Sequence, residues 1–373
     1  MKDFLIRLMA LMRKEFFTML RDPKSRMTII LPPIFQMFLF GYAATMDVNT
    51  VALAVMDNDR SELSRNYIAA VEGGGIFKRV ATTQSEAALS RLIDEKKALI
   101  ALTIPEDFSR KLQSGQSCNV QVISDGRNSN TAAIASGYLL NITSAYNKKL
   151  VRQTTGTSLP ISLESRAWYN PNYISRLLMV PSILAMLTLT SSVLFASLSI
   201  AREREEGTFD QLLVAPYRPA EILAAKAATN TLLVMGQALG IYLMIVYWFK
   251  VPYHGAPLLL TMAVFLIIAS STGIGLCISS FAHSLQQAIV GTFLCLVPMV
   301  MLSGITTPVA SMPPLFQKLT LANPMRYGVE LVRRLFLEEA GFHALSGHFL
   351  ILSAVTLLTL SACLIAFHRQ VNN

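Results

Sequence analysis

Long apolar segments separated by short polar ones dominate the pattern along this chain. Crossing a bilayer core of about 30 Å takes about 20 residues of α-helix. Six segments are apolar for long enough: 27–46, 177–201, 227–249, 256–282, 285–308 and 349–367. We therefore predict an α-helical membrane protein with six transmembrane helices. The fourth segment is rich in small residues between Ala269 and Gly275, which favours close helix contact.

A different pattern precedes the first apolar segment. Between Asp3 and Leu20, apolar residues recur every three or four positions, and basic residues occupy other positions. This spacing predicts a basic amphipathic helix within residues 1–26 that lies in the cytoplasmic membrane interface. The sequence Arg21-Asp22-Pro23 predicts the end of this helix, because proline disfavours helical geometry in the residue before it and can begin the next helix.

Residues 47–172 have the composition of a folded domain outside the bilayer. Short β-rich runs at 51–56, 76–80, 98–104 and 120–124 alternate with helical patterns at 61–71, 85–97, 105–113 and 130–153. Strands that alternate with helices indicate a small mixed sheet covered by helices. We expect an extracytoplasmic mixed α/β domain here, and the five further transmembrane helices in residues 173–373.

The segment after the fifth predicted span is interrupted repeatedly. Ser303-Gly304, Pro313-Pro314 and Asn323-Pro324 break an otherwise apolar stretch. It is too apolar for a free loop and too broken for a simple span. Re-entrant or interfacial half-helices fit this pattern, because irregular backbone at membrane depth must be shielded by protein or line a wet cavity.

Basic residues set the predicted orientation. Seven of them precede the first span: Lys2, Arg7, Arg13, Lys14, Arg21, Lys24 and Arg26. Cytoplasmic loops carry an excess of Lys and Arg, so we predict a cytoplasmic N-terminus, and six crossings return the C-terminus to the same side. The same alternation places residues 202–226 inside. Arg333 and Arg334 fall outside, and we expect them to snorkel toward headgroups from an interfacial helix.

Composition supports a membrane protein and argues against several other classes. The chain is 53% hydrophobic and 15% charged. Its net charge of +9 arises from basic residues beside the apolar segments, so we expect no nucleic acid partner. Three of the four cysteines, Cys277, Cys295 and Cys363, lie in apolar segments, which argues against a disulfide framework.

Candidates for chemistry are few. Asp57, Asp59 and Asp125 could form an oxygen metal site, but carboxylates in turns are more often turn formers and helix caps. The sequence lacks a His-Glu metal spacing, a Gly-x-Ser-x-Gly elbow and a phosphate-binding Gly-x-x-x-x-Gly-Lys-Ser/Thr loop. We expect no metal, bound cofactor or catalytic residue in this chain. If it moves a substrate uphill, the energy must come from a partner protein.

The charged run Arg202–Thr208 stands out, because it joins two uncharged apolar segments. It reads Arg-Glu-Arg-Glu-Glu-Gly-Thr, and an amphipathic stretch ending at Pro216 follows. One interpretation is a solvated turn that contains a helix. The other is a docking element for a soluble partner, favoured by the mixture of acids, bases, glycine and apolar residues.

These residues, together with others in the same order, resemble the permease subunits of ABC-2 type exporters, especially the bacterial multidrug-like branch with a large external domain. The resemblance covers nearly the whole chain. Its motifs are Lys14-Glu15, Arg21-Asp22-Pro23, Asn170-Pro171-Asn172, Ala201 to Thr208, Gln211 to Pro216, Leu302-Ser303-Gly304, Pro308, Met312-Pro313 and Asn323-Pro324.

The resemblance implies a permease of the bacterial inner membrane that exports hydrophobic or amphipathic drug-like molecules. It also implies a second permease, the same or paralogous, and cytoplasmic ABC ATPase subunits that bind ATP and Mg. A periplasmic adaptor is a further candidate partner, and membrane lipids surround the spans. The implied ATPase-coupling positions are Glu203, Glu205, Glu206, Gly207, Thr208, Gln211, Leu212 and Leu213. In the N-terminal interfacial helix the implied contact positions are Lys14, Glu15, Arg21, Asp22 and Pro23.

Two alternatives stay open from the sequence. The cargo could be a lipid or a lipid-linked polymer instead of a drug-like compound. In a different class, the chain could be a structural or signalling membrane protein with an extracytoplasmic sensor domain. An ATPase gene next to the permease gene would favour export.

Overall fold

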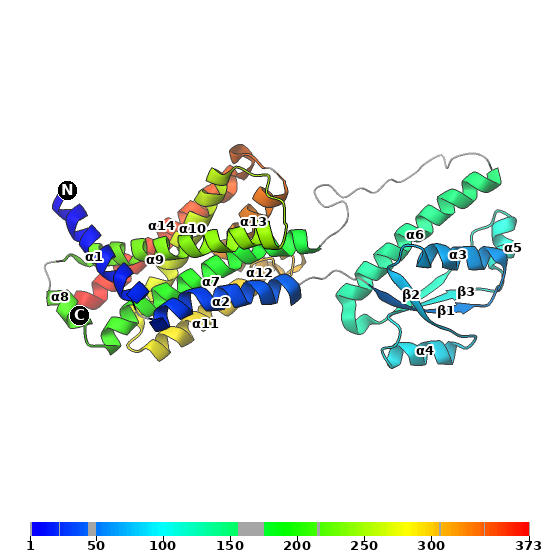
Figure 1. Cartoon of the computed structure of the whole chain (residues 1–373), viewed down its shortest axis with the longest axis horizontal. Helices are drawn as coiled ribbons and strands as arrows, with labels where there is room; N and C mark the ends of the chain where they lie inside the picture. Colours follow the sequence, from blue (N-terminus) through cyan, green and yellow to red (C-terminus); the bar gives the residue numbers. More distant parts are fainter. Residues whose placement is uncertain are drawn as a thin grey trace. The chain divides into compact units, whose positions relative to one another are not determined.

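The computed structural model describes residues 2–21, 23–43, 50–155, 175–214, 217–305, 307–338 and 340–372. The chain divides into two compact units, shown in Figure 1. Met1–Thr45 and Ala167–Asn373 form the helical unit, and Met46–Arg166 form the α/β unit.

The α/β unit contains a four-stranded mixed sheet. Its strands are β1 (Val51–Asp57), β2 (Phe77–Thr82), β3 (Ile100–Ile104) and β4 (Gln121–Ser124), in the order β2-β1-β3-β4. β1 is parallel to both β2 and β3, whereas β4 is antiparallel to β3. Each strand lies within two residues of its predicted bounds.

Helices cover both faces of this sheet. They are α3 (Glu62–Glu72), α4 (Glu86–Asp94), α5 (Phe108–Gln113) and α6 (Ser129–Thr155), with a 3-10 turn η1 (Gly126–Asn128) before α6. Side chains alternate along β1, so Leu53 and Val55 pack with α3 and α6, while Ala54 and Met56 pack with α4 (Figure 1). The predicted pattern of strands and covering helices is therefore confirmed.

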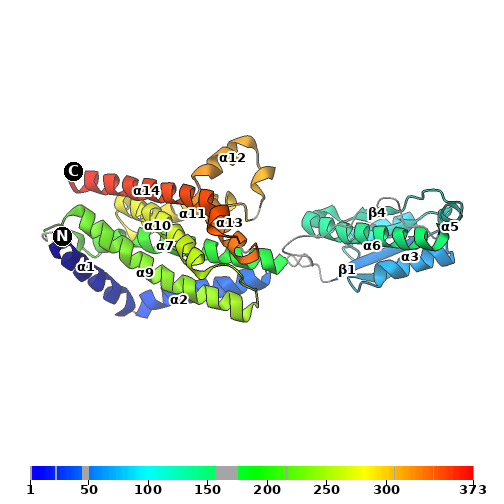
Figure 2. The same cartoon turned by 90° about the horizontal axis from the view of Figure 1, so that it is seen from above.

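The helical unit is built from antiparallel and oblique helices (Figure 2). Its longer helices are α1 (Lys2–Arg21), α2 (Pro23–Ala43), α7 (Ser175–Glu205), α9 (Pro219–Leu243), α10 (Pro257–Phe281), α11 (Leu285–Met301), α13 (Pro324–Leu337) and α14 (Phe342–Asn372). Its short elements are α8 (Phe209–Val214), the π-helical turn η2 (Met244–Trp248), η3 (Val309–Ser311), α12 (Pro314–Leu319) and η4 (Thr320–Ala322).

Four stretches of the described residues are long and apolar enough to cross a membrane. They are Arg176–Glu205, Pro219–Trp248, Pro257–Phe281 and Phe342–Gln370. Two of the predicted spans have shorter apolar helices, Ile30–Tyr42 in α2 and Leu285–Met301 in α11. The predicted end of the fifth span at residue 308 is wrong. α11 ends at Met301, and the chain then turns at Gly304, whose φ of 84° lies in the left-handed region that favours glycine.

The interrupted segment forms η3, α12, η4 and α13, as its breaks predict. Prolines open two of these helices, Pro314 in α12 and Pro324 in α13, where the missing N–H costs no helical hydrogen bond. The Asn323 side chain caps α13 by accepting from Met325 N at 3.0 Å, and its amide donates to Met299 O of α11 at 2.8 Å. α13 is therefore fixed to α11 at its first turn, and its re-entrant or interfacial placement stays a prediction.

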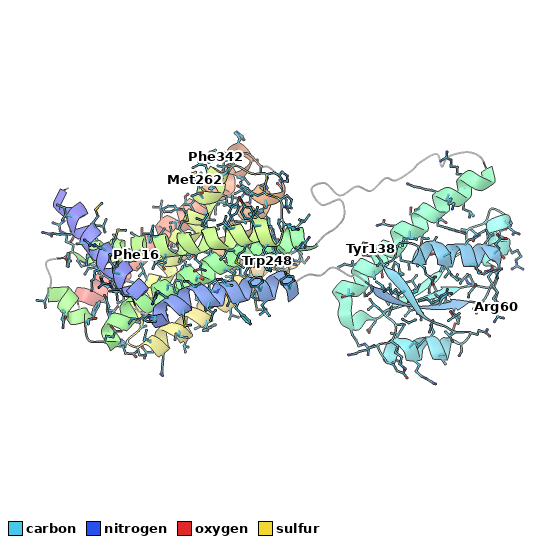
Figure 3. All side chains as sticks on the ribbon, viewed as in Figure 1. Phe16, Arg60, Tyr138, Trp248, Met262 and Phe342 are labelled. Atoms are coloured by element: carbon cyan, nitrogen blue, oxygen red, sulfur yellow. The ribbon has the colours of Figure 1, made fainter. Side chains whose placement is uncertain are left out.

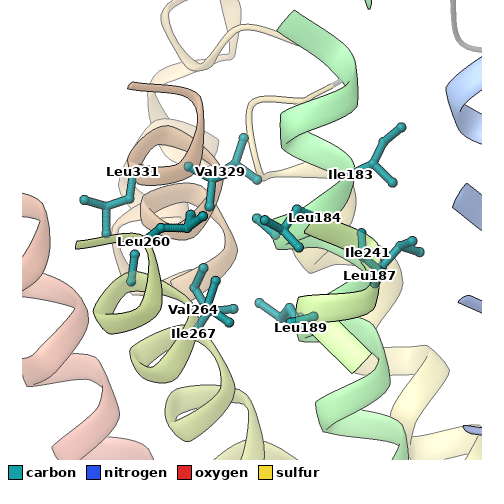
Figure 4. Packing of buried hydrophobic residues seen from close by; sticks show 14 of the residues in the cluster. Ile183, Leu184, Leu187, Leu189, Ile241, Leu260, Val264, Ile267, Val329 and Leu331 are labelled. Carbon is teal, nitrogen blue, oxygen red and sulfur yellow. The ribbon is translucent and has the colours of Figure 1, made fainter. Parts of the chain in front are cut away.

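α7 is the central helix of the helical unit. In its most apolar window 72% of the residues are buried, against 22% in the corresponding windows of α9 and α14. Figure 4 shows Leu184 and Leu189 of α7 facing side chains of α10 and α13, while Leu187 lies beside Ile241 of α9. A helix that is apolar on all sides belongs in a core, and α7 is enclosed by α2, α9, α10, α11 and α13.

Aromatic side chains join the end of α2 to η2, the turn that follows α9. Trp248, labelled in Figure 3, donates its indole N–H to Tyr42 Oη at 2.9 Å. The Phe38 ring meets Trp248 edge-on, with centroids 5.6 Å apart. Such rings concentrate where a span reaches the headgroups, so these contacts mark one end of the bundle.

Small residues bring α10 close to its neighbours. A Cβ at Gly275 would lie 2.5 Å from Val193 O of α7, and one at Gly273 would lie 2.7 Å from Thr359 Oγ1 of α14. The predicted role of this small-residue stretch in close packing is confirmed.

Gly275→Ala should lower the stability of the helical unit by about 1–3 kcal/mol, because the added methyl group meets the α7 backbone and cannot be accommodated by a side-chain rotation. Thermal unfolding in detergent measures the effect. Gly240→Ala on α9 is the matched control, since a Cβ there meets nothing within 4 Å. Equal melting temperatures for the two variants would contradict the close approach.

Candidate functional site

The charged run Arg202–Thr208 forms the end of α7 and the turn after it. Gly207 has a φ of 70°, and its N–H donates to Arg204 O at 3.1 Å. Thr208 N donates to Glu203 O at 2.9 Å. This pair of hydrogen bonds is the Schellman motif, in which a left-handed residue ends a helix. Gly207 therefore ends α7, and α8 begins two residues later.

Glu203 belongs to a cluster of charged side chains, the Lys226 cluster, made of Lys14, Glu15, Glu203 and Lys226, in which Lys14 is exposed and the other three are largely buried. Lys226 Nζ lies 3.1 Å from Glu15 Oε1 and 2.9 Å from Glu203 Oε2. It also donates to Ser199 Oγ at 3.2 Å. Lys14 Nζ approaches the other Glu203 oxygen at 3.6 Å. The cluster joins α1, α7 and α9.

The burial of the Lys226 cluster makes its pairing essential. The Lys226 side chain is 1% exposed, and the Glu15 and Glu203 side chains are 12% exposed. An isolated buried charge costs several kcal/mol, so the ammonium is stable here only because carboxylates surround it.

Arg204 and Glu205 connect the end of α7 to α10 and α11. Arg204 Nη1 donates to Ser280 O at 2.9 Å and to Ala282 O at 3.0 Å, so it caps the carboxyl end of α10. Glu205 Oε2 accepts from Leu285 N at 2.7 Å, at the amino end of α11. A cation at a helix C-terminus and an anion at an N-terminus both complement the helix dipoles.

Among the described side chains of α8, Phe209 is the one that packs into the bundle. Phe209 is buried, its ring meets Phe367 of α14 edge-on, and the Arg204 guanidinium lies 4.8 Å from the Phe209 ring centroid. Gln211 is exposed, and Val214 is 88% exposed. Leu212 and Leu213 lie in α8, but their side chains are outside the described part of the chain.

The other predicted positions are distributed around this site. Glu206 is exposed at the last residue before Gly207, and the Thr208 hydroxyl donates to Glu203 O at 3.3 Å. Arg21 ends α1 with its guanidinium 5.6 Å from the centroid of the Phe17 ring, and Pro23 begins α2. Asp22 lies outside the described residues.

Sequence reasoning missed Lys226 as a site residue. It lies at the end of the predicted cytoplasmic loop, where it counted only as a topology determinant. The available signal was its position two turns into an apolar helix, since a lysine there needs a buried acid. Its partner Glu15 is 211 residues away in the sequence, so no local pattern identifies the pair.

Polar contacts deeper in the bundle are neutral. Asn230 Nδ2 of α9 donates to Thr272 Oγ1 of α10 at 2.7 Å and to Ser192 Oγ of α7 at 3.1 Å. Hydrogen bonds of this kind hold membrane helices together without a buried charge. They tie the three central helices to one another about halfway along α7.

The aspartates of the α/β unit act as caps and turn formers. Asp57 accepts from Ser64 Oγ at 2.7 Å, and Asp59 accepts from Ser109 Oγ at 2.9 Å. The Arg127 guanidinium donates to both oxygens of Asp125 and lowers the pKa of that carboxyl. Within the described residues no group of three or more His, Cys, Asp and Glu side chains is placed to hold a metal ion.

Removing the cation of the Lys226 cluster should destabilise the helical unit strongly. Lys226→Ala leaves two buried carboxylates facing each other, and the expected loss is about 3–5 kcal/mol of unfolding free energy. Hydrogen exchange should also rise in α1, which loses an attachment to α9. Glu206→Gln is the control, because an exposed charge in the same run should change stability by less than about 0.5 kcal/mol. Similar effects for both variants would refute the buried pairing.

Comparison with known proteins adds the family context. Residues 24–365 match the family model described as ABC-2 family transporter protein. The chain is 36% identical over 367 residues to the probable multidrug ABC transporter permease YbhR of Escherichia coli K12, covering 98% of this chain and 99% of that protein. It is 28% identical to the probable multidrug ABC transporter permease YbhS of the same strain, covering 89% and 88%. It is 29% identical to the inner membrane transport permease YhhJ of that strain, covering 96% of each.

The matched residues begin in α2 and end in α14, so the match includes the run Arg202–Thr208. The helical unit, with its four long apolar helices, fits a membrane permease. This chain belongs to the ABC-2 family of transporter proteins.

Proposed function

We propose that this chain is the transmembrane permease subunit of an ATP-driven efflux transporter of the bacterial inner membrane, and that it exports hydrophobic or amphipathic drug-like compounds. Membership of the ABC-2 family and the multidrug names of YbhR and YbhS support this proposal. The chain has no phosphate-binding loop of its own, so a separate ABC ATPase supplies the energy and binds ATP and Mg.

The observation that carries the proposal is the construction of the α7–α8 corner. One side of α8 is anchored by Phe209, and the other presents Gln211 and Val214 to solvent. An apolar side chain that is 88% exposed on a short helix suits insertion into a groove of a partner. We assign that partner as the ATPase, with Glu206 and Gly207 at the edge of the contact.

Motion at α8 has a direct mechanical route into the bundle. Glu203 lies one turn before the corner and is tied through Lys226 to α9 and α1. Arg204 and Glu205 extend the connection to α10 and α11. In the proposed mechanism, closure of two ATPases pushes α8, and this rigid set of contacts turns the push into rotation of one permease half against the other. A second permease subunit, the same or paralogous, completes the pathway.

The distance between charged regions along α7 supports the proposed orientation. Ser182, which contacts Arg333, and Glu203 are roughly 30 Å apart at 1.5 Å per residue, close to the thickness of the hydrocarbon core. The Lys226 cluster and the basic N-terminal helix are then on the cytoplasmic side. Arg333, α12 and α13 are on the outer side, as is the α/β unit, which a periplasmic adaptor could contact. Both termini are cytoplasmic, and α2 and α11 complete six spans.

Gly207→Val should uncouple the permease from its ATPase. A β-branched residue at a φ of 70° costs about 1–2 kcal/mol, so the α7–α8 corner changes shape while the spans remain folded. In a reconstituted complex, substrate-stimulated ATP hydrolysis and export should both fall at least about tenfold, an estimate that corresponds to about 1.4 kcal/mol. Combining it with Glu206→Lys should abolish both activities.

The matched control for this uncoupling is Gly341→Val, the same substitution in the connection between α13 and α14. A Cβ there meets nothing within 4 Å, and the residue is at the opposite end of the bundle. Normal ATPase stimulation by the Gly207 variant would exclude the corner as the coupling element.

Single cysteines in a cysteine-free background test the orientation. Lys318→Cys on α12 should react with a membrane-impermeant maleimide in spheroplasts, because it is exposed and assigned to the outer side. Glu206→Cys should react only after permeabilisation. The reverse pattern would overturn the assigned topology.

A further inference from the structure

A basic hollow lies between α7 and α13, at the end of α7 away from the Lys226 cluster. Its volume is about 560 Å³, within the range of small-molecule sites. The hollow is lined by three arginines of α13, Arg326, Arg333 and Arg334, and by apolar side chains that include Leu178 and Val329.

The arginines are not equivalent. Arg334 Nε lies 2.7 Å from Glu338 Oε2, which neutralises its charge. Arg333 donates from Nε to Ser182 Oγ at 2.5 Å and from Nη1 to Gly304 O at 3.4 Å, both uncharged acceptors. Arg326 donates from Nη1 to Thr320 Oγ1 at 2.5 Å. Within the described part of the chain, neither Arg326 nor Arg333 has a carboxylate within salt-bridge distance.

These contacts hold the guanidinium groups while leaving donors for a ligand. A guanidinium has five N–H donors, and the contacts above use two from Arg333 and one from Arg326. Among the described residues that line the hollow, the one acid outside the Arg334 pair is Glu330, and His348 Nε2 lies 3.2 Å from its Oε1. The charge balance of the hollow is therefore positive.

α13 is a rigid support for these groups. Its opposite face is buried through Leu331, Val332 and Leu335, and Gly328 lies against Ile267 of α10. Arginine suits phosphate and carboxylate groups because its planar fork donates two parallel hydrogen bonds and it is more weakly hydrated than lysine. Leu178, on the rim, is 42% exposed and offers an apolar surface beside the charged groups.

We propose that this hollow binds the anionic headgroup of an amphiphile, a phosphate group that carries an apolar tail, with Arg326 and Arg333 holding the phosphate and Leu178 contacting the tail. The proposal rests on the membrane placement given under Proposed function, but not on the identity of the exported cargo. It also gives a reason for basic residues on the outer side, where the distribution of charge in membrane proteins does not require them. The source of the amphiphile is either a membrane phospholipid or an anionic cargo molecule.

Binding to the full-length chain in a zwitterionic detergent tests the proposal without the ATPase. The probes are short-chain phosphatidylglycerol, dodecyl phosphate, inorganic phosphate and short-chain phosphatidylcholine. The double variant Arg326→Gln, Arg333→Gln should weaken the binding of phosphatidylglycerol and of dodecyl phosphate at least about tenfold, since a single charge-assisted contact already contributes roughly that factor. Glu330→Gln should tighten it, because a competing anion is removed from the hollow.

Lys318→Gln is the matched control, because it removes one positive charge from the neighbouring α12 outside the hollow. Binding should then be unchanged, and all variants should keep the melting temperature of the native chain in neutral detergent. Tighter binding of phosphatidylglycerol than of dodecyl phosphate identifies a lipid site, and the reverse order identifies a cargo site.

Three results would overturn the proposal. One is equal binding of phosphatidylcholine, which would show that the anionic headgroup is not recognised. Another is binding of inorganic phosphate as tight as that of the amphiphiles, which would show that the apolar tail does not contribute to binding. The third is a loss of affinity for Lys318→Gln equal to that of the double arginine variant, which would show that general surface charge explains the effect. Since no ATP hydrolysis or export is measured, these outcomes are separate from any failure of the coupling variants.

Discussion

The buried ammonium of Lys226 is the interaction on which the end of the bundle near α8 depends. One positive charge that is almost fully removed from water holds carboxylates from α1 and α7 around the start of α9. Taking such charges out of water costs energy that is recovered only in good geometry, and removal of any one member leaves the others uncompensated. α1, which is far in the sequence from α7 and α9, therefore has to move together with them at this end. That property suits an element that passes a displacement from a partner into the membrane.

The same end of α7 shows how a charged run can serve two purposes. Glu203, Arg204 and Glu205 each point to a different neighbour, α9, α10 and α11 respectively. The run is thus more than a solvated turn, which was one of the two interpretations that the sequence left open. Of the α8 side chains that the structure describes, Phe209 is buried, whereas Gln211 and Val214 are exposed. A firmly held helix end next to this short helix provides a fixed base for an exposed contact surface.

Much of this architecture could be predicted from local sequence patterns. The strands of the α/β unit and the boundary between Arg21 and Pro23 both follow from turn and cap chemistry that acts within a few residues. The Lys226–Glu15 pair could not be found this way, because its members meet only after the bundle has folded. The end of α11 was also misjudged, since the predicted span 285–308 ran past the break at Ser303-Gly304, where the chain turns with a φ of 84° at Gly304.

α7 contacts charged side chains of other helices near both of its ends, whereas its middle is apolar. Near its first turns Ser182 receives the guanidinium of Arg333, and near its last turn Glu203 receives the ammonium of Lys226. Between them the contacts are apolar or are neutral hydrogen bonds such as those around Asn230. A rigid helix of this length moves its two ends together, so a displacement of Glu203 also moves Ser182. The helix that receives the push of the ATPase in the proposed mechanism thus also forms a wall of the basic hollow on the other side of the membrane.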